Sequence, residues 1–536
     1  MRRAQNAMLT WPALLLLAIS SCSSEDGDEP ESAATSDTKA ETSANKPASS
    51  GTSGSPAVTS SSSTTTPTAS ASSTTTGSAA PGAVPARLTV SGPVEGGLGK
   101  PFTATAADLA ASGYSEKEFF FEGAATSYEL QGEMSPDGKW SLKEGPKAAF
   151  KSRLLVRRPK DASKFNGTVV VEWLNVSGGA DGDPGFMYNA DEILREGYAY
   201  VGVSAQAVGV VGGGLSLGAA GGAKPLKQAD PERYGTLNHP GDGYSFDIYG
   251  QAGKILRDGA PQNVLEGLKP ERLIAYGESQ SAMRMVSYVN GVHPLGKVYD
   301  GYFIHSRSAG GVPFGASGGL SLGGFGGGVA KIRDDIDAKV FQFQTETDVT
   351  GMLGFLAARQ PDTHKLRTWE VAGTAHADQY LTDFNAKLAS EGAVNCPGAN
   401  NGPQPFVIRA ALHALNQWLV DGTAPAHGKV LATNDNNTPK TDEHGNTQGG
   451  VRSPAVDVPI STLSGAPAAG SGDFWCFLFG STTPFSADKL KALYPTHDDY
   501  VKKVEAAARK SREAGFLLEP EEKLIVEQAK AAPIPE

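Results

Sequence analysis

The sequence predicts an α/β fold with a mostly parallel central sheet flanked by helices, and three observations support it. Apolar strand-like runs alternate with helical stretches, for example over 192–203, 247–258 and 298–304. The apolar run that begins at Leu273 turns sharply through small residues into a helical stretch. Glycine-rich loops follow two of the strand-like runs. This rhythm is typical of parallel strands with helices packed on both faces.

The segment over 87–156 precedes this core and is predicted to add antiparallel strands at the edge of the sheet. It contains three short aromatic or apolar runs, at 119–121, 127–130 and 148–150. Near the other end of the chain, 406–420 is predicted to be a helix that packs on the sheet, because apolar residues recur along one of its sides.

The turn into the helix reads Gly277-Glu-Ser-Gln-Ser281, which resembles the G-x-S-x-G elbow of α/β-hydrolases. In that elbow, small flanking residues allow a strained strand-to-helix turn that lifts the serine Oγ out of the sheet. Ser281 stands where the motif has its final glycine, and its small side chain keeps the turn feasible. A serine between small residues also occurs in plain turns. The motif therefore makes Ser279 a candidate nucleophile, but the motif alone does not establish this role.

Two later strand ends supply the partners that a serine nucleophile needs. The run over 339–348 ends in two acids, and the run from Trp369 leads into a small-residue loop that carries His376. A serine hydroxyl needs an imidazole to take its proton, and the imidazole needs a carboxylate to fix its tautomer. The chain order serine, acid, histidine is that of the α/β-hydrolase fold. The sequence thus predicts this fold, extended by N-terminal antiparallel strands and glycine-rich loop insertions.

Two acids compete for the third position. Glu346 and Asp348 lie two residues apart, and in extended chain their side chains would point the same way. Asp348 is favoured, because the acid of such enzymes lies in a turn past the strand and Asp348 is the further out. Glu346 is the alternative, and either residue could instead only cap the turn or bind backbone amides.

An oxyanion hole needs two backbone N–H groups, one from the residue after the nucleophile and one from a loop after an earlier strand. Gln280 supplies the first. The apolar run over 168–173 leads into a polar loop, and the second donor is expected between Leu174 and Ser177, with Asn175 as the leading candidate. The alternative for Asn175 is that it only closes a turn with its side chain.

These motifs occur together in a group of bacterial α/β-hydrolase-domain proteins, which this chain resembles from about residue 88 to its C-terminus. The shared segments are Glu172-Trp-Leu-Asn175, Gly277-Glu-Ser-Gln-Ser281, Thr345-Glu-Thr-Asp348 and Ala372-Gly-Thr-Ala-His-Ala-Asp378. The resemblance implies a triad of Ser279, His376 and an acid at Asp348 or Glu346. It implies no substrate, because the group is characterised by its fold and triad more than by its chemistry.

The N-terminus predicts a lipoprotein signal peptide over 1–22. Two arginines precede an apolar run over 14–19 that is too short to span a bilayer as a mature helix, and the segment ends in a lipobox-like Ser20-Ser-Cys22. Cys22 would become the lipidated first residue of the mature protein and hold it on a membrane. An ordinary signal peptide cleaved elsewhere is the alternative.

Residues 23–85 are acidic at first and then rich in Ser, Thr, Ala, Gly and Pro. Such a segment cannot bury a core, so it is predicted to be a disordered tether between the anchor and a catalytic domain over 86–536. The residue after Cys22 is Ser23 rather than an aspartate. In Gram-negative bacteria this resembles the signal that sorts a lipoprotein to the outer membrane. The expected location is the cell envelope, at the outer membrane or the cell surface.

Apart from Cys22, the chain has two cysteines, Cys396 and Cys476. An even pair in an oxidising compartment predicts a disulfide, which would staple a C-terminal loop to the core. Two buried free thiols are the alternative.

Composition narrows the range of partners. No group of cysteines or histidines has metal-ligand spacing, so neither a metal nor another cofactor is expected. The net charge of −11 argues against nucleic acid as a partner.

The hexapeptide Gly-Gly-Leu-Ser-Leu-Gly occurs twice, at 213–218 and 318–323. Each copy follows a strand-like run and is expected at the carboxyl edge of the sheet, where α/β proteins bind ligands. The two loops either form lips that cover an apolar acyl or aryl group, or are exposed insertions without ligand contact.

The sequence therefore predicts a lipid-anchored serine hydrolase, most simply a carboxylesterase that acts on a small-molecule or polymeric ester. One alternative is an amidase or peptidase with the same triad, which turnover of amides would reveal. Another is an inactive hydrolase fold that serves as a binding lipoprotein, against which the complete set of serine, acid and histidine argues.

Overall fold

The computed structural model describes residues 87–213, 224–259, 264–315, 328–387, 396–468, 470 and 474–534. The predicted signal peptide, Cys22 and the predicted tether lie outside the described residues. So do the hexapeptide at 318–323 and, except for Gly213, the hexapeptide at 213–218.

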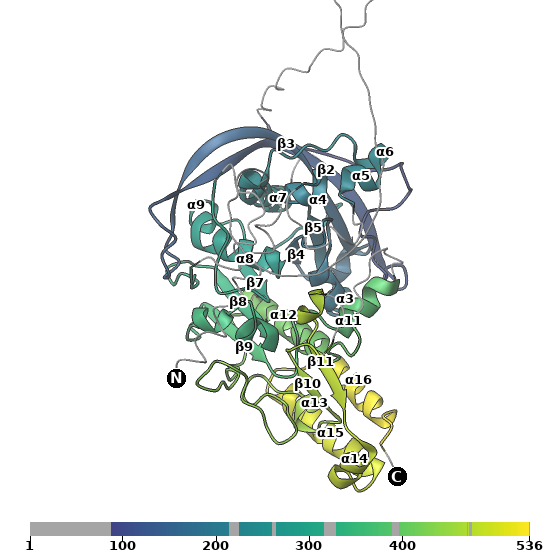
Figure 1. Ribbon diagram of the computed structural model, residues 1–536. Coiled ribbons are helices and arrows are strands. Elements are labelled where there is room, and N and C mark those ends of the chain that lie inside the picture. The colour runs from purple at the N-terminus through teal and green to yellow at the C-terminus, as the bar shows by residue number, and fades with distance from the viewer. Residues whose placement is uncertain are drawn as a thin grey trace, which may run out of the picture. The chain divides into compact units, whose positions relative to one another are not determined.

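A nine-stranded sheet runs through the described residues in the order β1-β2-β3-β5-β4-β6-β7-β8-β9 (Figure 1). The strands from β5 to β9 in this order pair in parallel, whereas β1, β2, β3 and β5 pair antiparallel. The strands are β1 (Thr89–Ser91), β2 (Tyr114–Gln131), β3 (Ser141–Pro159), β4 (Thr168–Trp173), β5 (Ala199–Val203), β6 (Arg272–Glu278), β7 (Gly301–His305), β8 (Lys339–Thr345) and β9 (Leu366–Val371). The predicted α/β-hydrolase fold, with antiparallel strands on its N-terminal side, is confirmed.

The strands β2 and β3 form a long antiparallel hairpin, which arches across the top of the view in Figure 1. Their pairing runs from Tyr114 opposite Pro159 to Gln131 opposite Ser141. Most of the aromatic residues that suggested these strands lie in the core, where the rings of Phe121 and Phe150 meet edge to face at 5.2 Å, whereas Phe120 packs in a separate apolar cluster with Tyr234. The hairpin therefore extends the sheet at the edge where the sequence predicted it.

Helices cover both faces of the sheet. The helices α7 (Ser245–Asp258) and α8 (Gln280–Ser287) contribute apolar side chains to the core on one face, and α3 (Pro184–Glu196) and α12 (Gln404–Val420) to the core on the other. The helix α12 contains the stretch that was predicted to be helical, and its N-terminus begins two residues earlier. Parallel strands covered on both faces explain why their sequences are continuously apolar.

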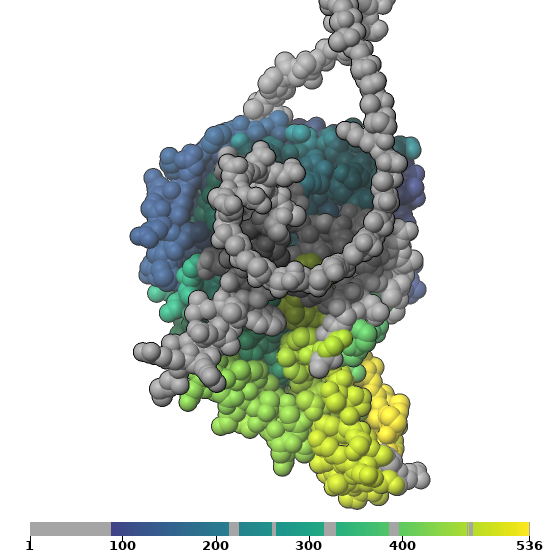
Figure 2. Space-filling model, viewed as in Figure 1, coloured from purple at the N-terminus to yellow at the C-terminus, as the bar shows by residue number. Residues whose placement is uncertain are grey.

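The chain after α12 forms a smaller layer with an apolar cluster of its own, around Leu490, Tyr494 and Val504. In Figure 2 this green-to-yellow part occupies the lower end of the face drawn. It consists of α13 (Pro454–Asp457), the antiparallel pair β10 (Ser461–Ser464) and β11 (Ser481–Pro484), α14 (Ala487–Leu493), α15 (His497–Glu513) and α16 (Glu519–Lys530). Within the described ranges, no helix is both long enough and apolar enough to cross a membrane.

Short elements connect the layers. The α-helical ones are α4 (Ala207–Val211), α5 (Leu226–Ala229), α6 (Pro231–Tyr234), α9 (His293–Gly296), α10 (Glu346–Thr350) and α11 (Gln379–Lys387). The other helical turns are η1 (Ala162–Lys164), η2 (Asp242–Tyr244), η3 (Tyr288–Val292), η5 (Phe355–Ala358) and η6 (Phe474–Leu478).

Candidate active site

Ser279 lies in a strained turn between β6 and α8. Its φ of 56° and ψ of −117° lie in a region that residues with a side chain rarely adopt. Gly277 makes the turn possible, because a Cβ there would lie 2.6 Å from the carbonyl oxygen of Ser281. Ser281 is accommodated in place of the usual glycine, and its hydroxyl donates to the Leu174 carbonyl at 3.3 Å. The turn leaves Ser279 partly exposed between buried neighbours.

Ser279, His376 and Asp348 form one continuous hydrogen-bonded chain. The Nε2 atom of His376 lies 2.8 Å from the Oγ atom of Ser279, and its Nδ1 atom lies 2.7 Å from Oδ1 of Asp348. Burial lowers the pKa of His376, but the Asp348 carboxylate and then Glu278 raise it, so that the pKa lies above its ordinary value. This geometry can pass a proton from the serine to an imidazole whose orientation a carboxylate fixes.

The loop that carries Asp348 is a short helix rather than the extended chain considered from the sequence. The strand β8 ends at Thr345, and Thr345 and Asp348 cap each other: the Thr345 hydroxyl accepts the Asp348 N–H, and Oδ2 of Asp348 accepts the Thr345 N–H. Because the residues lie in a helical turn, Glu346 and Asp348 point in different directions. Only Asp348 reaches His376.

Glu346 binds backbone amides, the other role considered for this pair of acids. Its two carboxylate oxygens accept the N–H groups of Gly373 at 2.6 Å and of Gly465 at 3.0 Å. Burial raises the pKa of Glu346 to about 7. Thr347, between the two acids, accepts the N–H of His376 and donates to the Gly465 carbonyl.

The loop after β4, where the sequence placed the second oxyanion donor, does not leave the N–H group of Asn175 free. The N–H of Asn175 donates to the Gly182 carbonyl, and its side-chain amide donates to the carbonyl oxygen and to Oε2 of Glu278. Asn175 therefore has no N–H group left for a ligand. The next N–H, that of the buried Val176, donates to no atom among the described residues, and the same holds for the N–H of Gln280. Of the two predicted donors, Gln280 thus keeps an unbonded N–H group among the described residues and Asn175 does not, whereas the neighbouring Val176 does.

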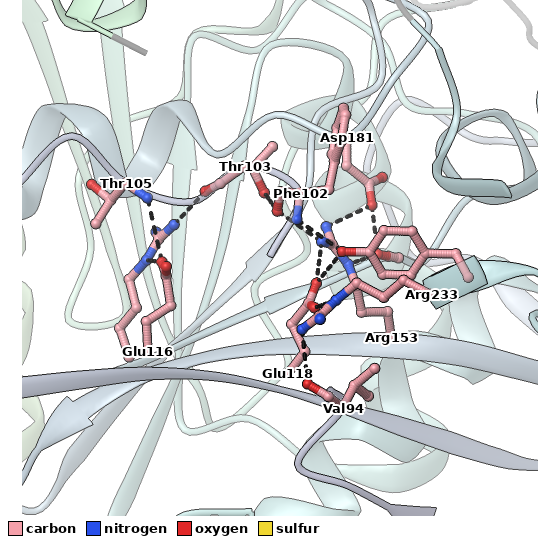
Figure 3. Close-up of polar contacts among 12 residues, drawn as sticks. Val94, Phe102, Thr103, Thr105, Glu116, Glu118, Arg153, Asp181 and Arg233 are labelled. Atoms are coloured by element: carbon pink, nitrogen blue, oxygen red, sulfur yellow. Dashed lines mark hydrogen bonds and ion pairs between the residues drawn. The ribbon is translucent and has the colours of Figure 1, made fainter. Parts of the chain in front are cut away.

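Buried arginines on β3 hold this loop in place. Arg153 donates to Asp181 at 3.0 Å and to Glu118 at 2.8 Å, as Figure 3 shows, and Arg157 pairs with Asp183. Both arginine side chains are fully buried, so an unpaired carboxylate would be costly here. The two ion pairs fix the end of the loop that begins at Asn175.

Glu278 is the site residue that the sequence interpretation missed. Its Oε1 atom lies 3.7 Å from Nε2 of His376, and burial raises its pKa to about 7. It occupies the first of the two variable positions of the elbow motif, so its place next to the nucleophile in the sequence was visible. Its contact with His376 was not, because that depends on how a loop almost a hundred residues later returns to the same strand end.

The predicted disulfide between Cys396 and Cys476 is present. The two segments that it joins both contact the histidine loop: the Leu478 carbonyl accepts the Ala377 N–H, and the Asn400 carbonyl accepts the Gln379 N–H. The disulfide therefore joins the two segments whose backbone carbonyls bind the loop that carries His376. Among the described residues, no group of three or more His, Cys, Asp or Glu side chains is arranged to hold a metal ion.

The fold agrees with that of a known family of proteins. The chain belongs to the alpha/beta hydrolase domain family, whose model matches residues 90–527. A comparison with curated proteins finds no match.

Solved structures of serine hydrolases and esterases are distantly similar. An α/β serine hydrolase without lid from Xanthomonas campestris is 13% identical, over 49% of this chain and 89% of that one, with a TM-score of 0.26. A glucuronoyl esterase from Solibacter usitatus is 11% identical, over 57% and 87%, with a TM-score of 0.26. The esterase Est22 is 11% identical, over 49% and 74%, with a TM-score of 0.26. Similarities this distant assign no residue a role.

Proposed function

We propose that this protein is a serine hydrolase that cleaves carboxylic esters through an acyl-enzyme. The observation that carries the proposal is the hydrogen-bonded chain from Ser279 through His376 to Asp348, at 2.8 and 2.7 Å. A binding protein would gain nothing from a strained serine joined to a buried imidazole and carboxylate.

The reaction follows from these atoms. The Oγ atom of Ser279 attacks the acyl carbon while its proton passes to Nε2 of His376, and the N–H groups of Gln280 and Val176 receive the developing oxyanion. The first turn of α8 adds a favourable dipole at Gln280. The C–O bond then breaks, and the alcohol leaves with the proton from Nε2. A water molecule then gives a proton to Nε2 of His376 and attacks the acyl carbon. The bond between that carbon and Oγ of Ser279 breaks, Oγ takes the proton back from Nε2, and the acid leaves.

Labelling by a fluorophosphonate probe tests the proposal, because the probe reports an activated serine when the substrate is unknown. We expect the wild-type chain to be labelled and the variants Ser279→Ala and His376→Ala to remain unlabelled. Turnover of a panel of esters and matched amides then separates esterase from amidase or peptidase, since an amine leaves only with effective proton donation from His376. A folded wild-type chain that is neither labelled nor active would refute the proposal.

We also propose that the enzyme is held at the cell envelope by a lipid on Cys22. The support is the lipobox-like end of the predicted signal peptide, which lies outside the described residues. Incorporation of labelled palmitate into the wild-type chain but not into Cys22→Ser, with loss of the variant from the membrane fraction, is the expected result. Equal membrane fractions for both would contradict the anchor.

A further inference from the structure

The carboxyl group of Glu278 lies between two parts of the proposed active site, the histidine loop and the loop after β4. Its Oε2 atom accepts a hydrogen bond from the side-chain amide of Asn175 at 2.8 Å, in the loop that carries the Val176 N–H. Its Oε1 atom faces Nε2 of His376 at 3.7 Å. That nitrogen is the one bonded to Ser279, so Glu278 lies on the side of the imidazole where protons are exchanged with substrate.

We propose that Glu278 is a positioning residue of this site: its carboxylate stabilises the imidazolium that forms when His376 takes the proton of Ser279, and its bond to Asn175 ties that imidazole to the oxyanion loop. This inference rests on the proposed function of Ser279 as nucleophile.

Two carboxylates then flank one imidazole. Asp348 bonds Nδ1 and fixes the ring, while Glu278 lies near Nε2 without sharing its hydrogen bond. Both carboxyl groups are buried, where the attraction between opposite charges is weakened far less than in water. A positive charge on His376 is therefore favoured from both sides, and the direction of its pKa shift agrees with this.

Glu278 itself, whose pKa burial raises to about 7, carries its full negative charge only above that pH. The other titratable groups near Glu278 and His376 hold their charge state around neutral pH, with one exception. His305, the partner of Glu278 on the neighbouring strand β7, is buried, and burial lowers its pKa to about 3. Burial raises the pKa of the hydroxyls of Tyr188 and Tyr276 well above their ordinary value, so both remain neutral. The exception is Asp378, whose pKa burial raises to about 7.

The proposal predicts a change in the proton affinity of one identified imidazole. In Glu278→Gln the amide oxygen can still accept from Asn175, but the negative charge near Nε2 is gone. The titration midpoint of His376 should therefore move to lower pH by about one unit, a tenfold change in proton affinity. The acid limb of kcat/KM, which reports the need for a neutral imidazole, should move in the same direction. On the plateau, kcat should fall by about tenfold with KM little changed, since the stabilised charge exists only during reaction.

The experiment uses the full chain in detergent. NMR of ¹⁵N-labelled histidine follows His376, assigned by difference from His376→Ala, and turnover of a p-nitrophenyl ester gives the pH profile. Glu172→Gln is the matched control, because Glu172 is another fully buried carboxyl group on the neighbouring strand β4, held by the N–H groups of Gly185 and Phe186. A second control, Asp378→Asn, removes the other nearby group that titrates near neutral pH.

A lower midpoint in Glu278→Gln, with the midpoints of both controls unchanged, supports the proposal. An unchanged midpoint in a folded Glu278→Gln overturns it. If that variant does not fold, Glu278→Met replaces it, because its side chain has a similar length and no charge. If the wild-type chain neither hydrolyses esters nor reacts with the fluorophosphonate, the proposed function fails, whereas the NMR midpoint still decides whether Glu278 acts on His376.

Discussion

The carboxylate of Glu346 accepts a hydrogen bond from the backbone N–H of Gly465, 119 residues further along the chain. The same carboxylate accepts the N–H of Gly373 in the loop that leads to His376. Thr347 adds a second link, since its hydroxyl donates to the Gly465 carbonyl and accepts the His376 N–H. The segment after β10 thus supports the proposed catalytic histidine from behind.

We expect Gly465→Ala to lower both stability and activity. A Cβ at this position would lie 2.6 Å from Cβ of Glu346 and 2.6 Å from the Thr347 nitrogen, so the acid loop would have to move. Such overpacking costs about 1–3 kcal/mol. Urea unfolding and ester turnover measure the two effects. Gly296→Ala is the control, because its Cβ would make an ordinary contact of 3.6 Å with Val298. Equal behaviour of the two variants would show that the acid loop tolerates the displacement.

Replacing each acid in turn should separate the role of Asp348 from that of Glu346. Asp348→Asn leaves the geometry but no longer fixes the tautomer of His376, a change that costs serine proteases about 10⁴ in kcat. Glu346→Gln leaves His376 in place but presents an amide N–H₂ to a backbone N–H, which costs about 1–3 kcal/mol of stability. Steady-state kinetics and thermal unfolding of both variants check this. A larger loss of kcat in Glu346→Gln than in Asp348→Asn would reverse the assignment.

The sequence was sufficient for the parts of the site that lie within one local segment. The strand-turn-helix around Ser279 and the order of acid and histidine follow from local patterns, and they fix which strand ends meet. The choice between Asp348 and Glu346 needed the structure, because it depends on where a helical turn begins after β8. That the N–H of Asn175 is bonded and that of Val176 is free among the described residues could not be predicted for a similar reason, because it depends on which neighbouring amides are bonded across the loop.

Contacts between distant segments could not be predicted from the sequence. Nothing in the pattern around Gly465 shows that Glu346 leaves no room for a side chain there, and nothing around Glu278 shows that His376 returns to it. Such contacts depend on the path of loops whose own sequences carry no periodic signal.

Opening the disulfide between Cys396 and Cys476 should slow the enzyme as well as destabilise it. The bond closes 80 residues of chain, and removing such a bond costs about 2–5 kcal/mol. Because the joined segments accept hydrogen bonds from Ala377 and Gln379, His376 should also lose part of its orientation. We expect slower fluorophosphonate labelling of the double variant Cys396→Ala/Cys476→Ala well below its unfolding temperature. Labelling at the wild-type rate by a less stable variant would confine the disulfide to a stabilising role.

Four buried carboxyl groups should make the folded protein less stable as the pH rises from 5 to 8. Burial raises the pKa of Glu172 to about 8, and that of Glu278, Glu346 and Asp378 to about 7. In the unfolded chain these groups titrate near pH 4. Between these values the native state binds more protons than the unfolded state, so the free energy of unfolding falls as the pH rises, by up to about 1.4 kcal/mol per pH unit for each group.

Asp378→Asn tests this dependence at one group. Oδ1 of Asp378 accepts from the Tyr188 hydroxyl and the Leu381 N–H, whereas Oδ2 is buried and has no partner within the part of the chain that the structure describes. An asparagine can keep both bonds through its oxygen and cannot ionise. In urea unfolding at pH 5 and pH 8, the variant should therefore lose less stability than the wild type between the two values, and should be the more stable protein at pH 8. Parallel pH dependences for the two proteins would show instead that Asp378 is ionised in the folded state throughout this range.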